Sequence, residues 1–252
     1  MLKFINLASG SKGNTSLFYD DDFLFVIDFG TCKKTLVDGL KLINKKLSDV
    51  DSFFFTHNHI DHIKGLNFID ANKVYALKGT LNLDNYNYLE YYREYNIKNV
   101  LIIPLKTSHD ANNPLGYLFK YKDEELVYIT DTGVIPLKTL NLIQNKEYYI
   151  FESNHDIKLL LQSNRSLLLK DRILSTLGHL SNDLCSFYLG ELIGKRTKKI
   201  LLAHLSEECN SDDIALDTLY TYLDSINIDR SNIDIDTLKQ HSVTTLWLRL
   251  SF

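Results

Sequence analysis

The sequence predicts a layered fold in which β-strands alternate with α-helices. Short apolar runs are separated by longer amphipathic stretches, and this alternation favours a layered α/β arrangement. No Ser/Gly/Pro-rich linker, abrupt change of composition or solenoid-type repeat divides the 252 residues. Since a chain of this length can bury a sufficient core alone, we expect one domain over residues 1–252.

The expected strands are the short apolar runs, which lie at residues 2–7, 14–19, 23–28, 51–56, 73–76, 99–104, 115–122, 125–130, 147–151, 198–203 and 243–250. The expected helices are the amphipathic stretches at residues 33–46, 62–69, 80–95, 135–145, 182–194 and 212–225. In the third of these, the tyrosines from Tyr88 to Tyr95 follow helical spacing. We therefore expect them to form a packing face of a helix rather than a platform for unpaired bases.

Two of the expected strands end in the same way. The segments FLFVIDFG (Phe23–Gly30) and ELVYITDTG (Glu125–Gly133) each place Asp, one further residue and Gly after an apolar run. Asp and Gly favour turns, so a strand followed by a turn explains the pattern. Two similar halves packed face to face would show the same pattern, and both explanations remain open.

The composition narrows the class of protein. A net charge of -4 argues against a charge-driven coat for nucleic acid, although a local basic groove stays possible. The three cysteines are widely spaced and form no C-x-x-C pair, as in proteins of the reducing cytosol. The chain starts without a secretory signal, and no apolar run approaches the ~20 residues of a bilayer span. We expect a cytoplasmic protein with no membrane partner.

The segment His57-Asn58-His59-Ile60-Asp61-His62 is the strongest local signal in the chain. It follows Phe53–Thr56, which we expect to be a buried strand, so four metal-binding side chains lie on the loop that leaves the strand. Imidazole and carboxylate groups suit zinc and similar divalent ions. A solvated polar turn would rarely need three histidines within six residues, so the loop predicts a metal site.

Three further residues have equivalent positions in the chain, because each follows an expected strand. These residues are His109, Asp131 and His204. Any one of them alone would be explained as a capping or core histidine, or as a turn aspartate. Ligands at the ends of several strands of one sheet edge would, however, form a shared site. Together with the histidine loop, they predict one metal centre built from several strand ends.

This order of ligand types resembles the metallo-β-lactamase fold, an α+β fold described as an αββα four-layer sandwich with a two-metal site. Within it, the chain is similar to the YycJ/WalJ-type group of nuclease-like hydrolases, which is related to ribonuclease Z. The resemblance extends from residue 4 to about residue 210. The motifs that carry it are Leu7–Asn14, Ser108–Ala111, Ile129–Gly133, Phe151–Asp156, Gly178–Asn182 and Leu202–Ser206.

The resemblance implies a role for each candidate ligand. His57, His59 and His109 would bind one metal ion. Asp61, His62 and His204 would bind the second, and Asp131 would bridge the two. Asp28 would orient the histidine loop by hydrogen bonding and would not bind metal itself. The ligand types accept zinc, manganese or iron, and zinc is our first expectation.

The same resemblance implies a hydrolytic mechanism. A hydroxide held between the two cations would attack a phosphodiester, with Asp61 orienting the water or taking its proton. His179 is the candidate general acid for the leaving group, held and charged by Glu152, like the Glu–His pair of ribonuclease Z. The competing explanation is structural: Glu152 would cap the following helix, and Gly178-His179 would form a helix C-terminal turn.

Some motifs lead to weaker expectations. The Gly-rich loop over Ser9–Asn14 could receive a phosphate on its N–H groups, or it is simply a tight turn. It lacks the P-loop pattern, so we expect no nucleotide cofactor. The candidate substrate contacts are Ser9, Ser11, Asn14 and His155. A helix-start role explains His155 equally well, and His241 receives no role.

The sequence therefore predicts a two-metal phosphodiesterase, a nuclease that acts on DNA as an exonuclease. The alternatives are a small-molecule phosphodiester or thioester hydrolase of the same fold, or a regulatory module that retains metal. The substrate, the preference for DNA over RNA, the polarity of cleavage and the oligomeric state do not follow from the sequence.

Overall fold

The computed structural model describes residues 2–240 and 244–247. The chain forms two compact units. The first unit comprises Met1–Pro104, Ala111–Pro114 and Lys239–Phe252, and the second comprises Leu105–Asp110 and Leu115–Leu238. The expectation of a single domain stays a prediction, and His241 lies outside the described residues.

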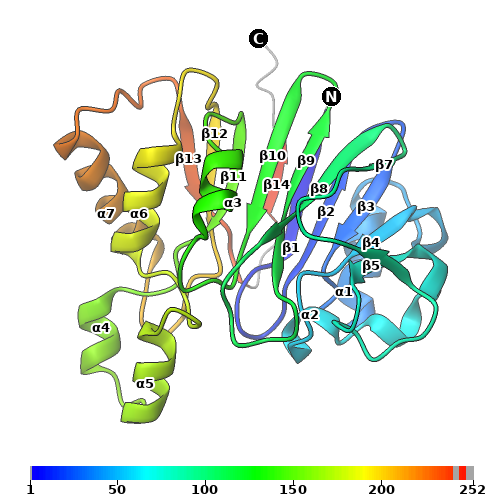
Figure 1. Cartoon of the computed structure of the whole chain (residues 1–252), viewed down its shortest axis with the longest axis horizontal. Helices are drawn as coiled ribbons and strands as arrows, with labels where there is room; N and C mark the ends of the chain where they lie inside the picture. The colour runs from blue at the N-terminus through cyan, green and yellow to red at the C-terminus, as the bar shows by residue number, and fades with distance from the viewer. Residues whose placement is uncertain (1, 241–243, 248–252) are drawn as a thin grey trace. The chain divides into compact units, whose positions relative to one another are not determined.

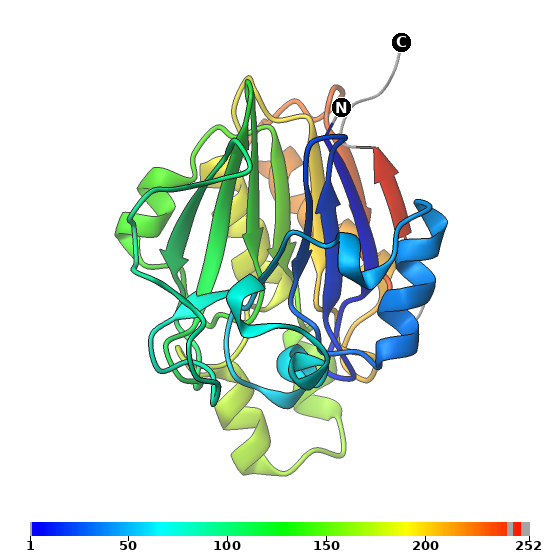
Figure 2. The same ribbon diagram turned by 90° about the vertical axis from the view of Figure 1, so that its right-hand side faces the viewer.

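The first sheet has the strand order β14-β1-β2-β3-β4-β5-β6. Its N-terminal strands pair antiparallel, and β3 to β6 pair parallel. Helix α1 (Lys33–Leu42) lies against this sheet, as Figure 2 shows, and buries Leu36 and Leu40 in its core. The strands are β1 (Lys3–Ala8), β2 (Thr15–Tyr19), β3 (Leu24–Ile27), β4 (Ser52–Phe54), β5 (Val74–Leu77), β6 (Asn87–Leu89) and β14 (Thr244–Trp247).

The second sheet has the strand order β13-β12-β11-β10-β9-β8-β7. Strands β10 to β13 pair parallel, so their carboxyl ends meet at one edge. The strands are β7 (Tyr95–Ile97), β8 (Val100–Lys106), β9 (Leu115–Tyr121), β10 (Glu124–Ile129), β11 (Tyr148–Glu152), β12 (Lys199–Ala203) and β13 (Asp234–Thr237).

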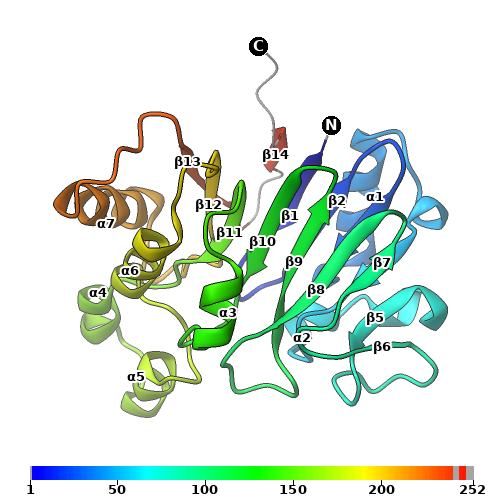
Figure 3. The ribbon, with the colours of Figure 1, turned by 45° about the horizontal axis from the view of Figure 1, so that its top comes forward.

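Four helices of the second unit begin at a side chain that caps them. The side chains of Asp156, Ser166, Ser181 and Ser211 each accept a hydrogen bond from the backbone N–H three residues on, which satisfies an otherwise unpaired donor. Helices α6 and α7 lie side by side (Figure 1 and Figure 3). The helices are α3 (Leu137–Leu142), α4 (Ile157–Gln162), α5 (Leu167–Leu174), α6 (Asn182–Leu192) and α7 (Asp212–Ser225).

The structure confirms most of the expected elements and contradicts two. In place of the helix expected over 62–69 it has the single turn α2 (Ile60–Ile63) and a 3₁₀ turn at Leu66–Phe68. Every expected strand is present within two residues at each end, except that part of 243–250 lies outside the described residues. The expected helix over 80–95 is wrong, because this segment holds β6, the start of β7 and turns. Strands β6, β7 and β13 and helices α4 and α5 were not expected.

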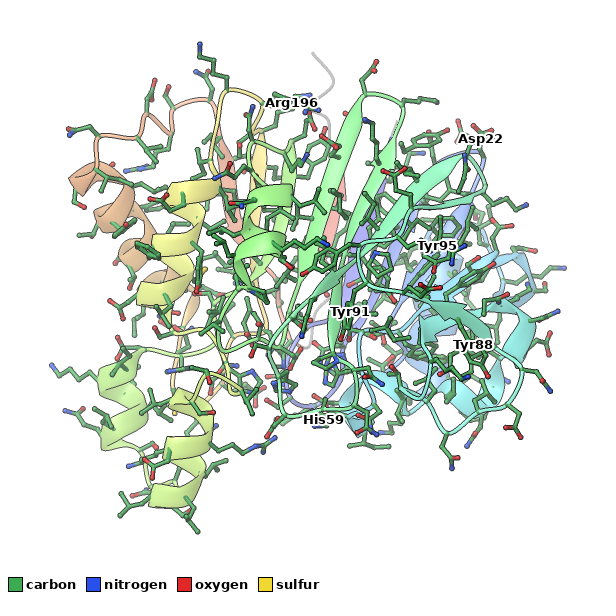
Figure 4. The ribbon with its side chains drawn as sticks, viewed as in Figure 1. Asp22, His59, Tyr88, Tyr91, Tyr95 and Arg196 are labelled. Carbon is green, nitrogen blue, oxygen red and sulfur yellow. The ribbon has the colours of Figure 1, made fainter. Side chains whose placement is uncertain are left out.

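The tyrosines of this segment explain the error. Their phenol groups bind backbone rather than line one helix face: the Tyr86 hydroxyl donates to the carbonyl of Leu77, and that of Tyr91 donates to the carbonyl of Pro114. Tyr92 has a left-handed backbone (φ 65°), which a helix does not allow. Figure 4 shows Tyr88, Tyr91 and Tyr95 at three separate places. The three- and four-residue spacing of these tyrosines therefore reflects separate contacts with the backbone and not a shared helix face.

Candidate active site

The first unit places four candidate ligands on one short loop. His57 and His59 follow β4, and α2 (Ile60–Ile63) then turns Asp61 and His62 back. The ring of His57 lies 4.7 Å from that of His59 and 4.0 Å from that of His62, measured between centroids. Nε2 of His62 lies 3.8 Å from Oδ2 of Asp61. His57 and His62 are buried, whereas His59 is partly exposed on the loop (Figure 4).

Asp28 holds this loop in place. Its Oδ1 accepts the N–H of Thr56 at 2.8 Å, and its Oδ2 accepts the Thr56 hydroxyl at 2.9 Å and the Nδ1 of His62 at 2.8 Å. The role of Asp28 in orienting metal ligands stays a prediction. Burial raises the pKa of Asp28, while His62 and Thr56 oppose that rise. A carboxylate so engaged orients ligands and has little freedom to bind a cation itself.

Close backbone contacts fix the position of helix α2, which carries Asp61 and His62. A Cβ atom at Gly30 would lie 1.4 Å from the carbonyl oxygen of Asp61, so only glycine fits there. The Asn14 N–H donates to that same carbonyl at 2.7 Å, and the Asn14 side chain bonds Gly10 and, at 2.9 Å, Nε2 of His62. The amide of Asn14 is therefore engaged within the chain.

The second unit gathers its candidate ligands around Asp131, which follows β10. The Oδ1 of Asp131 lies 3.5 Å from Nε2 of His204 and 4.0 Å from Nε2 of His109. It also lies 3.9 Å from Nδ1 of His179. Burial lowers the pKa of His109, and this favours the neutral ring that can bind a metal ion. Strand ends far apart in sequence thus meet at one carboxylate.

Glu152, at the end of β11, connects two histidines of this group. Its Oε1 accepts the Nδ1 of His179 at 2.8 Å and the Nδ1 of His204 at 2.9 Å. Its Oε2 accepts the N–H groups of Thr132 and Leu180. Burial alone would raise the pKa of Glu152, but the charges and hydrogen bonds of the two histidines lower it to about 2. Glu152 is therefore a carboxylate at neutral pH.

The donor set suits a divalent cation. The Nδ1 atoms of His62 and His204 are held by Asp28 and Glu152, and that of His109 lies 3.1 Å from the carbonyl of Gly178. A ring that donates from Nδ1 has its lone pair on Nε2, which is the form that binds a metal. Within the second unit, Asp131, Glu152, His179 and His204 offer ligand atoms that all lie within 4.8 Å of one another.

The residues predicted to contact substrate differ in their exposure to solvent. Ser9 and His155 are buried, and Ser11 is exposed. Burial lowers the pKa of His155 to about 4, so its ring is neutral at pH 7. The substrate contacts predicted for these residues and for Asn14 stay predictions.

Sequence reasoning missed several polar residues that hold the site together. Thr56 connects Asp28 with Nδ1 of His57 at 3.0 Å, and Asn154 donates to the carbonyl of His204 at 2.8 Å. Asn154 lies inside the motif Phe151–Asp156, which was a signal that could have been followed. Thr56 had no signal beyond its place before the first histidine.

Comparison with known proteins identifies the family. The chain is 34% identical over 237 residues to exodeoxyribonuclease WalJ of Streptococcus pneumoniae serotype 2, a match that covers 88% of each chain. It is 32% identical over 229 residues to exodeoxyribonuclease YycJ of Bacillus anthracis, covering 85% of this chain and 86% of that protein. The chain belongs to the WalJ/YycJ family. The resemblance seen in the sequence is confirmed.

Solved structures confirm the fold class of this WalJ/YycJ family member. The metallo-β-lactamase fold protein YhfI from Bacillus subtilis matches with a TM-score of 0.70 and 15% identity, covering 97% of this chain and 99% of that one. Human tRNase Z, short form, matches with a TM-score of 0.64 and 12% identity, covering 98% and 100%. The chain has the α+β metallo-β-lactamase fold and is a metal-dependent hydrolase.

Two further findings concern parts of the chain. Residues 8–86 match the family model described as "Anti-Pycsar protein Apyc1". Among the helices that the structure describes, none combines the length and the apolar character that a membrane crossing requires.

Proposed function

We propose that this WalJ/YycJ family member is a two-metal phosphodiesterase that degrades DNA as an exonuclease. Two relatives with about a third of their residues identical are named exodeoxyribonucleases. Every ligand type of the two-metal pattern is retained in this sequence. We also propose that the enzyme works in the cytoplasm as a single domain.

The proposed metal centre has the seven ligands that the family resemblance implies. His57, His59 and His109 hold one cation, and Asp61, His62 and His204 hold the other, with Asp131 as the bridge. We propose zinc, because imidazole nitrogens dominate the set. When bound, such a cation pair activates water and neutralises the charge that develops on the phosphate. Asp61 orients the attacking water or accepts its proton, and Ser9 and Ser11 lie among the candidate substrate contacts.

The observation that carries the proposal is the bond between Glu152 and His179. A phosphodiester releases a poor leaving group, an alkoxide, which needs a proton. The Glu152 carboxylate holds Nδ1 of His179 at 2.8 Å. Nε2 is then the atom that donates the proton to the leaving oxygen. A thioester or lactam hydrolase needs such a group less, because its leaving group is better.

The test measures degradation of 5′- and 3′-labelled DNA by the purified protein with zinc or manganese. We expect loss of terminal nucleotides, abolished by EDTA and restored by added metal. The variant His179→Ala should lower kcat by about 10² to 10⁴. Its metal content, measured by mass spectrometry, should equal that of the unchanged protein. Equal DNA degradation by this variant would remove the general-acid role.

A substrate with a good leaving group provides the matched comparison. Bis(p-nitrophenyl) phosphate releases nitrophenolate, which needs no proton, so His179→Ala should slow its hydrolysis far less than that of DNA. Hydrolysis of this ester or of a thioester by the unchanged protein, without any DNA degradation, would instead support a small-molecule hydrolase. Native purification without bound metal would support the regulatory alternative.

A further inference from the structure

Two buried asparagines of the second unit form a reciprocal pair of side-chain hydrogen bonds. Asn182 is the first residue of α6, and Asn210 precedes the serine that caps α7. The two residues are only 1% and 9% exposed. Nδ2 of Asn182 donates to Oδ1 of Asn210 at 2.9 Å, and Nδ2 of Asn210 donates to Oδ1 of Asn182 at 2.9 Å. The pair therefore joins the start of α6 to the start of α7.

The end of strand β11 is bound to the same pair. Ser153 directly follows Glu152, and its hydroxyl donates to Oδ1 of Asn182 at 2.7 Å. The carbonyl of Ser153 accepts Nδ2 of Asn210 at 2.9 Å. Every polar side-chain atom of Ser153, Asn182 and Asn210, which we call the amide cluster, thus has a partner. A buried polar network that is fully hydrogen-bonded makes the segments that it joins rigid.

The amide cluster is continuous with the segment that carries His179. Asn182 lies three residues after His179. Between them, the carbonyl of Leu180 accepts the N–H of Asn154 at 2.9 Å, and the N–H of Leu180 donates to Oε2 of Glu152 at 3.2 Å. The end of β11 and the segment after His179 therefore lie side by side, and the amide cluster fixes the far end of this pairing.

The ring of His179 depends on its backbone for its direction. In the part of the chain that the structure describes, its side chain makes one hydrogen bond, from Nδ1 to Oε1 of Glu152. A single bond holds Nδ1 but lets the ring pivot, so the position of Nε2 follows the backbone of residue 179. The N–H of His179 bonds the carbonyl of Ile173 at 3.0 Å, and Asn182 holds the segment on the other side. A displacement of about 1 Å at a reacting atom can cost about 100-fold in rate.

We propose that the amide cluster positions His179 for proton transfer to the leaving group. Ser153, Asn182 and Asn210 are then positioning residues, because they act through His179 and do not touch the substrate. The side-chain hydrogen bonds of the cluster connect its members with one another and with the N–H of Ser211, and not with a candidate metal ligand. The inference rests on the proposed nuclease function and deepens it, by naming the residues that place its general acid.

The test replaces Asn182 by alanine and measures kcat on labelled DNA and on bis(p-nitrophenyl) phosphate, whose leaving group needs no proton. We expect kcat for DNA to fall about 10- to 100-fold, and kcat for the ester to fall by less than about threefold. KM and bound metal should stay unchanged. In the background of His179→Ala, the further change Asn182→Ala should have no added effect on DNA, because the residue that it positions is gone.

The matched control is Asn6→Ala. Asn6 is also buried, at 0% exposure, and its Nδ2 donates to the carbonyl of Lys239 within the first unit. Its replacement removes a comparable buried amide, so any loss of rate should be the same factor for both substrates. If circular dichroism shows that Asn182→Ala does not fold, Ser153→Ala decides instead, because it removes a single hydroxyl. Its rate on DNA should then fall about three- to tenfold more than its rate on the ester.

The outcomes separate this inference from the proposed function. If His179→Ala impairs DNA degradation selectively but the folded cluster variant slows both substrates equally, the inference is overturned and the general acid stands. The same holds if Asn182→Ala adds a further loss in the His179→Ala background, or if Asn6→Ala shifts the preference as much as Asn182→Ala does. An unchanged preference in His179→Ala removes the general acid and the inference with it. Absence of DNA degradation by the original protein overturns the proposed function itself.

Discussion

The two Asp-x-Gly turns share a backbone design and differ in what their aspartates do. Asp28 and Asp131 both follow a buried strand and both adopt a left-handed backbone, with φ of 55° and 53°. The glycine of each turn allows close contact: Gly30 touches the backbone of Asp61, and a Cβ at Gly133 would lie 2.4 Å from the carbonyl of Ser175. Both turns thus support a segment that carries chemistry.

The aspartates differ because their neighbours differ. Asp28 accepts three hydrogen bonds from Thr56 and His62, so it fixes the orientation of the histidine loop. Asp131 lies near the Nε2 atoms of His109 and His204, and we propose it as a metal ligand. In the second unit, Glu152 from the adjacent strand is the carboxylate that accepts hydrogen bonds from histidine rings. Under this proposal the same turn carries a ligand in one unit and a residue that orients ligands in the other.

The largest expected difference between the turns is in catalysis. Asp131→Asn should lower metal-dependent hydrolysis about 10³-fold, because the proposed bridging carboxylate contributes several kcal/mol to binding the cations. Asp28→Asn should lower it only about 10- to 100-fold, as the loop keeps its ligands but loses their orientation. Hydrolysis of bis(p-nitrophenyl) phosphate at one fixed, limiting zinc concentration measures both. Equal losses in the two variants would contradict the division of roles.

The glycines should separate the turns by stability. Gly30→Ala should lower the free energy of unfolding by about 3 kcal/mol. The new Cβ would overlap the backbone carbonyl of Asp61, and helix α2 cannot shift far enough to remove that overlap. Gly133→Ala, with a less severe overlap, should cost about 2 kcal/mol. Urea denaturation of the metal-free proteins measures both. If the Gly133 variant proves the less stable, the ranking by contact distance is wrong.

Substitution of the holding carboxylate in the second unit should have two effects at once. Glu152→Gln keeps the shape but weakens the bonds to His179 and His204, so zinc affinity should fall about 10- to 100-fold. Degradation of DNA should fall further than hydrolysis of the nitrophenyl ester, because the general acid is also affected. Metal titration and paired kinetics measure the two effects. Loss of metal affinity with an unchanged preference between substrates would restrict Glu152 to holding His204.

The smallest expected effect concerns the loop that supports the first turn. Asn14→Ala removes the side-chain bonds to Gly10 and His62 but keeps the backbone bond to Asp61. The free energy of unfolding should fall by about 1–2 kcal/mol. KM for DNA should change less than twofold if the residue only holds the loop, and a rise of tenfold at full stability would instead support a substrate contact.

The sequence indicated the candidate ligands of the first unit more directly than those of the second. His57 to His62 lie within six residues, so their spacing alone predicted a metal site. The bond between Glu152 and His204 joins residues 52 positions apart and depends on the parallel register that pairs Glu152 with Ala203. Neither composition nor periodicity encodes that register.

The missed elements have similar causes. Strand β13 reads Asp-Ile-Asp-Thr and has too few apolar residues to stand out. Helices α4 and α5 carry leucines on both their inner and their outer sides, which removes the polar face that identifies an amphipathic helix.

The left-handed backbone of the site residues has a consequence for evolution. Asp28, Asp131 and His204 all have φ between 53° and 58°, a conformation that glycine adopts with less strain. Selection for folding alone would favour glycine at each position, as stabilising substitutions are easily reached in most proteins. Each of these side chains also makes contacts that glycine would lose, such as the bonds of Asp28 to His62 and of His204 to Glu152. Backbone strain is therefore accepted here in exchange for those contacts, as it also is at residues outside the site such as Tyr92 and Lys122.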